Sequence, residues 1–372
     1  SATGRIALGR FWLRRLRRLA PAYLLMALAA AAAAWWVLLP FELREAGKQM
    51  IAATVWLSNL LFWRQAGYFD AAAQEKPFLH TWSLAVEEQF YLALPLLLLL
   101  FALLALRARG IVTVLALAWA ASLAATLALT ASRPEAAFFL FPFRAWELLT
   151  GVLLAVLAPR PPRGARLVAG WAGIALVLAG MVLVRAEGFP GWQALLPVAG
   201  TALCLLSLGP PGAPEGAGRL LARRGPVALG RISYALYLWH WPVLVLAAYR
   251  AGGPLPPWEA AAWVAVAVAL SALSWRLVET PLRRPGGVVG DGAFLAGTAL
   301  GMAAVMGLGA WFYRTDGLPG RWGPEVAAHV AASQDFLQDW SRCGTPADGP
   351  FAGLEVCAVG PEGEAPRVLF WG

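Results

Sequence analysis

Four short strings of polar and aromatic residues, each within or beside an apolar run, hold the side chains that could do chemistry. In the string at residues 78–91, His80, Ser83 and Glu87 are spaced i, i+3 and i+7, which places them on one face of a helix. An imidazole and a carboxylate beside a membrane pocket could exchange protons with a substrate or orient a sugar hydroxyl. The alternative is a helix start that Thr81 or Ser83 caps, with Glu87 solvated. Spacing alone does not separate the two interpretations.

The string at residues 232–242 places a second histidine in a similar setting. Ser233, Tyr237 and His240 share one helical face, with His240 near the middle of an expected membrane span. Ionisable groups inside a membrane are costly, so such a residue is a candidate functional group by default. The alternative is a hydrogen-bonded structural histidine beside packing tryptophans.

Near the N-terminus, Arg15 and Arg18 lie three residues apart and therefore share a face at the inner membrane surface. Two guanidinium groups held in this way could grip the phosphates of a cytoplasmic cofactor. They could equally be charges that orient the helix against lipid headgroups. The spacing gives no reason to prefer one of these interpretations.

Two further carboxylates have nearby arginine partners. Arg144 and Glu147 lie three residues apart near the outer end of a span, where a mutual ion pair is as good an explanation as catalysis. Glu279 closes a later span at the inner surface, where it can pair with Arg276 or Arg283.

The elements that must position these groups are membrane helices. Apolar residues make up 60% of the 372-residue chain, charged residues only 14%, and the mean hydropathy is +0.63. A soluble domain carries about 25% charged residues, so this chain lacks the polar surface of a water-facing globule. Nine apolar runs approach or reach the ~20 residues of a bilayer span: 19–41, 92–106, 112–131, 146–158, 167–184, 192–208, 232–249, 260–275 and 294–313.

The basic residues set the expected topology. The net charge is +9 with a pI near 10.1, and arginines in cytoplasmic loops explain it better than nucleic-acid binding, so no nucleic-acid partner is expected. If the short apolar segment 50–63 does not cross, the inner loops hold 18 basic residues and the outer loops 8 before the last span. If it crosses, the split becomes 12 to 14, against the positive-inside rule. We therefore expect about nine spans plus one non-crossing segment, an all-α polytopic fold.

The three cysteines fall into two classes. Cys204 lies inside an apolar run, where a small buried thiol is the default. Cys343 and Cys357 flank a short loop in the polar tail, and such a pair suits a disulfide in an oxidising compartment. An unpaired couple is the alternative. The disulfide would place the tail outside the cytoplasm, as the charge count does independently.

The strings RFWLRRLRRLAPAY, HTWSLAVEEQFY, FRAWELLTG, ISYALYLWHWP and VETPLRR together resemble the bacterial acyltransferase-3 family in their order and spacing. The resemblance runs from about Thr3 to Arg284. It implies a membrane O-acyltransferase that moves an acyl group, with acetyl expected, from cytoplasmic acyl-CoA to a hydroxyl of an extracytoplasmic glycan, such as O-antigen, peptidoglycan or exopolysaccharide. Acyl-CoA is then a donor substrate, and neither a bound cofactor nor a metal is expected. The implied location is the bacterial inner membrane.

Residue by residue, the resemblance marks Arg15 and Arg18 as the acyl-CoA side and His80, Glu87 and His240 as catalytic candidates. The substrate-pocket candidates are Trp82, Tyr91, Arg144, Glu147, Ser233 and Tyr237. Other matching positions are Phe90, Tyr234, Pro242, Glu279 and Pro281. Resemblance does not decide which of them touch substrate.

The resemblance also implies more chain than the 372 residues hold. Family members carry two helices before the Arg-rich stretch, including an Arg/Lys and His pair central to activity. The main catalytic histidine is therefore expected upstream of Ser1, and the chain is not expected to be active alone. The expected domains are 1–290 (the acyltransferase-3 membrane domain without those helices), 291–313 (an additional span) and 314–372 (an extracytoplasmic linker and the first strand of a fused SGNH domain).

A transporter of a lipid-linked or glycan substrate is the alternative function. It would show internal repeats and helices broken at midplane.

Overall fold

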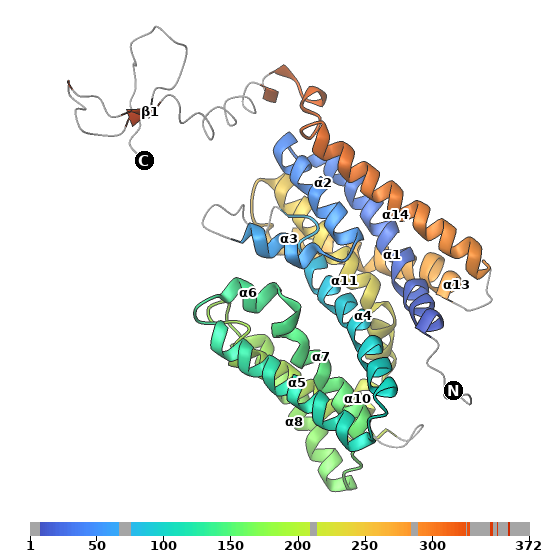
Figure 1. Cartoon of the computed structure of the whole chain (residues 1–372). Helices are drawn as coiled ribbons and strands as arrows, with labels where there is room; N and C mark the ends of the chain where they lie inside the picture. The colour runs from blue at the N-terminus through green and yellow to red at the C-terminus, as the bar shows by residue number, and fades with distance from the viewer. Residues whose placement is uncertain are drawn as a thin grey trace.

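The computed structural model describes residues 8–66, 76–208, 214–283 and 289–324, together with 326–327, 343–344, 348 and 356–357. These residues form a bundle of apolar helices, with two very short strands in the tail (Figure 1). The longer elements are α1 (Leu8–Val37), α2 (Pro40–Thr54), α3 (Ser58–Gln65), α4 (Thr81–Leu103), α5 (Ala108–Leu129), α6 (Pro134–Phe139), α7 (Phe141–Leu157), α8 (Arg163–Leu183), α9 (Leu195–Leu206), α10 (Ala217–Leu221), α11 (Arg224–Ala251), α12 (Pro257–Ser274), α13 (Thr280–Arg283) and α14 (Asp291–Arg314). A 3₁₀ turn, η2 (Trp192–Ala194), leads into α9, a π turn, η3 (Trp275–Glu279), joins α12 to α13, and a 3₁₀ turn, η4 (Pro319–Arg321), follows α14.

The predicted all-α membrane fold is confirmed. Within the described part of the chain, eight helical segments are long and apolar enough to cross a bilayer, with α6–α7 and α12–α13 each counted as one. The ninth predicted span, 192–208, corresponds to η2 and α9, which together cover only Trp192–Leu206. Because 15 residues of helix fall short of the ~20 that a bilayer core requires, this segment is a shorter apolar helix.

The predicted non-crossing segment is a helical hairpin. The expected single run at 50–63 is divided between α2 and α3, which are separated by a turn at Val55–Leu57, where Trp56 has a positive φ of 57°. Gln65 near the end of α3 donates to the Glu45 carboxylate near the start of α2, at 3.2 Å. The two open ends of the hairpin therefore lie together, and the segment enters the bundle and returns on the same side.

Two apolar cores lie on either side of α4. The first combines α1, α2, α11 and α14, and Leu84 near the start of α4 belongs to it. The second combines α5 and α7 with Phe90 and Phe101, which lie further along α4. In Figure 1, α4 accordingly runs between the group of α1, α2, α11 and α14 and the group of α5 to α8. A helix that serves both cores is a natural place for residues that must face the space between them.

Close packing of α2 on α14 depends on two glycines. A Cβ added to Gly47 would collide with the Gly309 carbonyl oxygen, and one added to Gly309 would lie 2.7 Å from the Gly47 carbonyl oxygen. Small residues at a membrane helix interface allow backbones to approach closely. The additional helix α14 is therefore packed into the bundle through the hairpin, and it begins and ends within a residue of the predicted 291–313.

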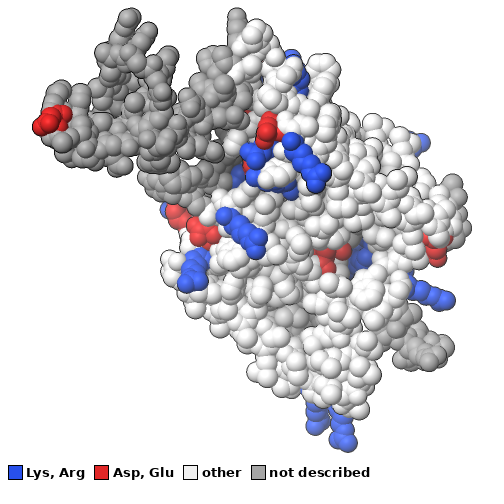
Figure 2. All heavy atoms as spheres, turned by 45° about the horizontal axis from the view of Figure 1, so that its top comes forward, with Lys and Arg blue, Asp and Glu red and all other residues white. Residues whose placement is uncertain are grey.

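Charge divides the two ends of the bundle. The end that holds the starts of α1, α5, α8 and α11, here called the Arg-rich end, carries most of the described arginines. In Figure 2, a broad area without charged side chains lies above the basic side chains at the bottom edge of the face shown. This pattern is typical of a bilayer-facing belt with a basic flank.

In the tail, two short strands pair with each other. β1 (Cys343–Gly344) pairs antiparallel with β2 (Val356–Cys357), and the register sets Cys343 opposite Cys357. Their side chains lie outside the described residues, so the disulfide stays a prediction. The expected first SGNH strand at the end of the chain also lies outside them.

Candidate active site

Most candidate residues lie along one face of α4 and the helices opposite it. The helix starts at Thr81, so His80 directly precedes its first turn, and Glu87 and Tyr91 follow in the next turns. Pro95, inside this helix, does not interrupt it. At about 1.5 Å per residue, His80 and Tyr91 are about 16 Å apart along the axis. The candidates thus extend over about half the thickness of a bilayer core.

At one end of this line, two histidines and a tyrosine form a cluster. The ring centroids of His80 and His240 are 6.0 Å apart, and that of Tyr237 is 5.5 Å from His80 and 5.6 Å from His240. The Tyr237 hydroxyl is 2.5 Å from the Ser83 hydroxyl and donates to the His80 carbonyl oxygen. The predicted face of α4 and the predicted face of α11 therefore meet, and His240, which lies near the middle of α11, packs beside the start of α4.

His80 is the most enclosed polar group of the cluster. Only 5% of its surface is exposed, and neither ring nitrogen makes a well-formed hydrogen bond with a described residue. Burial, together with the neighbouring His240, lowers the pKa of His80 to about 3. The imidazole is therefore neutral at physiological pH, and its lone pair is available to accept a proton from a substrate hydroxyl.

The backbone around His80 is held by side chains from separate elements. Gln49 of α2 accepts from the Phe78 N–H at 3.2 Å, and the Trp241 indole of α11 donates to the Lys76 carbonyl at 2.9 Å. The Thr81 hydroxyl donates to the Phe78 carbonyl at 2.7 Å rather than capping the helix as the alternative interpretation expected. Such contacts from outside the loop restrict where the imidazole can lie.

Toward the Arg-rich end, Arg15 of α1 joins the same line. Its guanidinium carbon is 3.6 Å from the centroid of the Tyr91 ring, a close cation–π contact. The Tyr91 hydroxyl donates in turn to Glu87. Glu87 is one turn closer than Tyr91 to the start of α4, where the histidine cluster lies.

Arg15 also borders a cavity of about 350 Å³. Glu88 of α4 and Trp56, at the tip of the α2–α3 hairpin, line the same cavity. The hairpin tip is fixed from the other side by Gln89, which donates to the Trp56 carbonyl at 3.1 Å and to Asn59 at 2.9 Å. The hairpin therefore contributes a wall to the cavity beside Arg15.

In the string at residues 143–151, Arg144 lies beside Trp82 and other aromatic rings. Arg144 pairs with Glu147, with Nε and Oε1 3.1 Å apart, as the ion-pair interpretation expected. The guanidinium also lies within 6 Å of three aromatic rings, those of Trp82, Phe138 and Phe189. Trp82, Arg144 and Glu147 are thus brought together, next to the start of α4.

Several candidates lie outside these clusters. Ser233 is exposed and donates to the carbonyl of Gly230 in its own helix, a full two turns from His240. Arg18 is exposed and does not line the cavity beside Arg15, although its charge acts on Glu279. Glu279 is itself buried, at the end of the π turn.

One predicted catalytic group falls beyond the residues that the structure describes. The resemblance places the main catalytic histidine upstream of Ser1, whereas the described residues begin at Leu8. That histidine and its basic partner therefore stay predictions. The histidines that the structure does describe, His80 and His240, are the two that meet at the start of α4.

Sequence reasoning missed three residues with clear structural roles: Arg17, Trp56 and Gln89. The buried Arg17 guanidinium binds the Leu282 and Val289 carbonyls and the Asp291 carboxylate, at 3.1, 2.9 and 2.6 Å. Arg17 is embedded in a run of arginines that all suit a cytoplasmic flank, so the sequence offers no signal that distinguishes it. Gln89 is a polar residue inside a predicted span, and that signal could have identified it.

Comparison with known proteins gives this arrangement a context. The family model described as an acyltransferase domain, acyltransferase-3, matches residues 1–276. The chain belongs to the acyltransferase-3 family. It is 34% identical to BcsY of Komagataeibacter xylinus, which carries the name of a membrane-bound transacylase, over 80% of this chain and 76% of BcsY. No solved structure matches it.

Two other acyltransferase-3 relatives are named O-acetyltransferases. YrhL of Bacillus subtilis, named for peptidoglycan O-acetylation, is 30% identical over 74% of this chain and 46% of its own length. OatA of Staphylococcus aureus is 27% identical over 76% of this chain and 49% of its own length. The chain thus spans about half the length of these two relatives. Family membership makes it a multi-pass membrane acyltransferase and disfavours the transporter interpretation, despite the broken α2–α3 hairpin.

Proposed function

We propose that this acyltransferase takes an acetyl group from acyl-CoA at the Arg-rich, cytoplasmic end and transfers it to a hydroxyl of an extracytoplasmic glycan. The observation that carries the proposal is the line of polar side chains along α4. It begins at the cavity beside Arg15, continues through Tyr91 and Glu87, and leads one turn further along α4 to Ser83, which with Tyr237 and His80 forms its other end.

The donor end has the chemistry that a thioester with a phosphorylated carrier needs. Arg15 offers fixed guanidinium donors at the rim, while Trp12, Trp56 and Leu295 give the cavity apolar walls. A planar guanidinium binds phosphate oxygens with two parallel hydrogen bonds. Glu88 in the same lining would repel phosphate, so we place the phosphates beside Arg15 and the acyl end past Tyr91, along α4 toward His80.

The acceptor end has the chemistry for activating a hydroxyl. A neutral, desolvated imidazole at His80 can take the hydroxyl proton as the oxygen attacks the acyl carbonyl carbon, and His240 lies close enough to share this role. The thiolate of CoA then leaves with the electron pair of the broken thioester bond. The names of YrhL and OatA support O-acetylation, and that of YrhL supports peptidoglycan as the acceptor.

The test uses inverted inner-membrane vesicles from cells that produce the protein, with radiolabelled acetyl-CoA added on the cytoplasmic face. Label should appear in glycan on the opposite face. Arg15→Ala should raise the KM for acetyl-CoA at least ~10-fold, the worth of a charge-assisted hydrogen bond. Arg14→Ala is the matched control, because Arg14 is the exposed neighbouring arginine and does not line the cavity.

The same vesicles test the acceptor end. His80→Ala should lower kcat by about 10²–10⁴ with little change in KM for acetyl-CoA, because a proton acceptor is lost and the donor cavity is not. The proposal fails if Arg15→Ala and Arg14→Ala behave alike, or if His80→Ala transfers label at the normal rate. Vesicles supplied with peptidoglycan, lipopolysaccharide or exopolysaccharide precursors separate the acceptor classes by which of them becomes labelled.

A further inference from the structure

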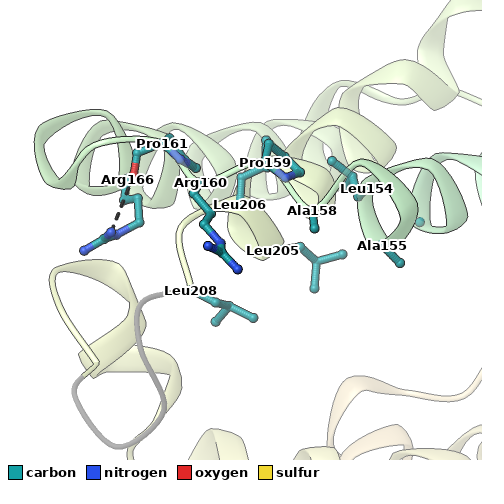
Figure 3. A pocket seen from close by; sticks show the side chains of 11 residues that line it. Leu154, Ala155, Ala158, Pro159, Arg160, Pro161, Arg166, Leu205, Leu206 and Leu208 are labelled. Atoms are coloured by element: carbon teal, nitrogen blue, oxygen red, sulfur yellow. Dashed lines mark hydrogen bonds between the residues drawn. The ribbon is translucent and has the colours of Figure 1, made fainter. Parts of the chain in front are cut away.

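A second cavity, of about 640 Å³, lies at the Arg-rich end and is separate from the one beside Arg15. It lies where α7 ends and α9 ends, beneath the segment 158–161 that joins α7 to α8 (Figure 3). The two cavities share no lining residue. None of the residues of the polar line along α4 borders this one, so it is not part of the proposed acyl-transfer path.

The walls of this cavity are hydrocarbon. Apart from two arginines, the lining residues that the structure describes are all Gly, Ala, Leu or Pro. Leu205 and Leu208 are 48% and 60% exposed, although they belong to or directly follow an apolar membrane helix. Large apolar side chains exposed on a membrane helix face lipid rather than water. An occupant that lies on these walls must therefore present an alkyl chain.

The rim of the cavity is cationic. In Figure 3, Arg160 extends toward Leu208, whereas Arg166 turns away toward the Pro161 carbonyl. The nearby carboxylate of Glu215 is already paired, with Arg163 at 3.1 Å and with Arg166 at 3.8 Å. Among the described residues, no carboxylate lies within ion-pair distance of Arg160. The rim thus offers one uncompensated guanidinium above an alkyl-lined space.

We propose that this cavity binds an anionic phospholipid, with the phosphate at Arg160 and an acyl chain along Leu154, Leu205 and Leu208. A basic pocket between membrane helices at the cytoplasmic side is the arrangement that anionic headgroups recognise. A nucleotide fits less well, because the described residues of the lining include no polar side chain other than the two arginines to meet a base or a ribose. The volume is within the usual range of small-ligand pockets, enough for a headgroup and part of one chain.

The experiment measures retained lipid. The protein is purified in mild detergent, incubated with phosphatidylglycerol or phosphatidylcholine, and examined by native mass spectrometry. We expect phosphatidylglycerol to be retained in preference to phosphatidylcholine. Arg160→Gln should weaken this retention about fivefold, the value of one arginine near an anionic surface. Arg109→Gln is the matched control, since Arg109 is an exposed arginine at the same end of the bundle that does not line the cavity.

A second variant tests the alkyl-lined space without altering charge. Gly151 lines the cavity, and a Cβ added there meets no atom within 4 Å, so a side chain can begin at this position without displacing the backbone, and Gly151→Phe should narrow the space. It should reduce bound phosphatidylglycerol while leaving the thermal unfolding midpoint unchanged. The proposal is overturned if both phospholipids bind alike, if Arg160→Gln behaves as Arg109→Gln does, or if acetyl-CoA displaces the bound lipid one for one.

Discussion

The burial of His80 predicts a specific loss of stability at acid pH. The folded protein holds this imidazole with a pKa of about 3, whereas the unfolded chain has the ordinary value of 6.5. As the pH falls through 6.5, the unfolded state gains a proton that the folded state does not, so folding is disfavoured. pH 5 lies about 1.5 units below 6.5, and each unit corresponds to about 1.36 kcal/mol, so His80 should lower the free energy of unfolding by about 2 kcal/mol there.

The measurement compares the wild type with His80→Gln, a neutral polar replacement of similar length. Equilibrium unfolding in mixed detergent micelles is followed at pH 7.5 and at pH 5. Carboxylates elsewhere titrate in both proteins, so the difference between the two isolates His80. The wild type should lose about 2 kcal/mol more than the variant between the two pH values. If the two lose the same amount, His80 is not held neutral by burial, and its assignment as the proton acceptor loses its physical basis.

Three further predictions concern other parts of the bundle. Arg17→Ala should lower the free energy of unfolding by about 2–4 kcal/mol, because charge-assisted hydrogen bonds to Leu282, Val289 and Asp291 are lost. In the same denaturation assay, Arg14→Ala should change the free energy of unfolding by less than ~0.5 kcal/mol, because Arg14 is exposed. Gly47→Ala should lower the free energy of unfolding by about 1–3 kcal/mol, because the added Cβ collides with α14. Gly297→Ala is the control, because a Cβ at Gly297 meets open space. Equal thermal unfolding midpoints for the two variants would contradict the close packing of α2 on α14. The predicted Cys343–Cys357 disulfide leaves only Cys204 reactive when the oxidised protein is unfolded and its thiols are titrated. Cys343→Ser should add one reactive thiol, that of Cys357. Three reactive thiols in the wild type would exclude the disulfide.

The sequence predicted the membrane helices and the non-crossing segment well, because hydrophobicity and charge alone decide these features. Apolar runs predicted the membrane helices because burying charge in lipid is costly, and the arginine count predicted a non-crossing segment at 50–63. Helical spacing predicted that His80 and Ser83 share a face, and the Tyr237 hydroxyl contacts both residues. These inferences use local periodicity or a global charge rule, and neither depends on which helices become neighbours.

Other features depend on tertiary contacts that a pattern does not encode. Ser233 shares a helical face with His240 by spacing, yet two turns along a long helix carry it to the Arg-rich end, away from the histidines. Arg15, Arg17 and Arg18 look alike in sequence, but only Arg15 lines the cavity and only Arg17 is buried. The difference arises from what α4, α13 and α14 place around α1, which requires the whole bundle.

The α2–α3 hairpin connects the two ends of the proposed reaction path. Its tip, Trp56, lines the cavity beside Arg15, and Gln49 on its first helix holds the Phe78 N–H two residues before His80. One element therefore contacts both the donor cavity and the loop of the proton acceptor, and Gly47 against Gly309 fixes it to α14. Under the proposed function, a displacement of this hairpin would alter acyl-CoA binding and acyl transfer together, whereas changes at Arg15 or His80 should each affect one of them. Because α14 follows the residues that the family model matches, the segment outside the matched domain helps to position the groups inside it.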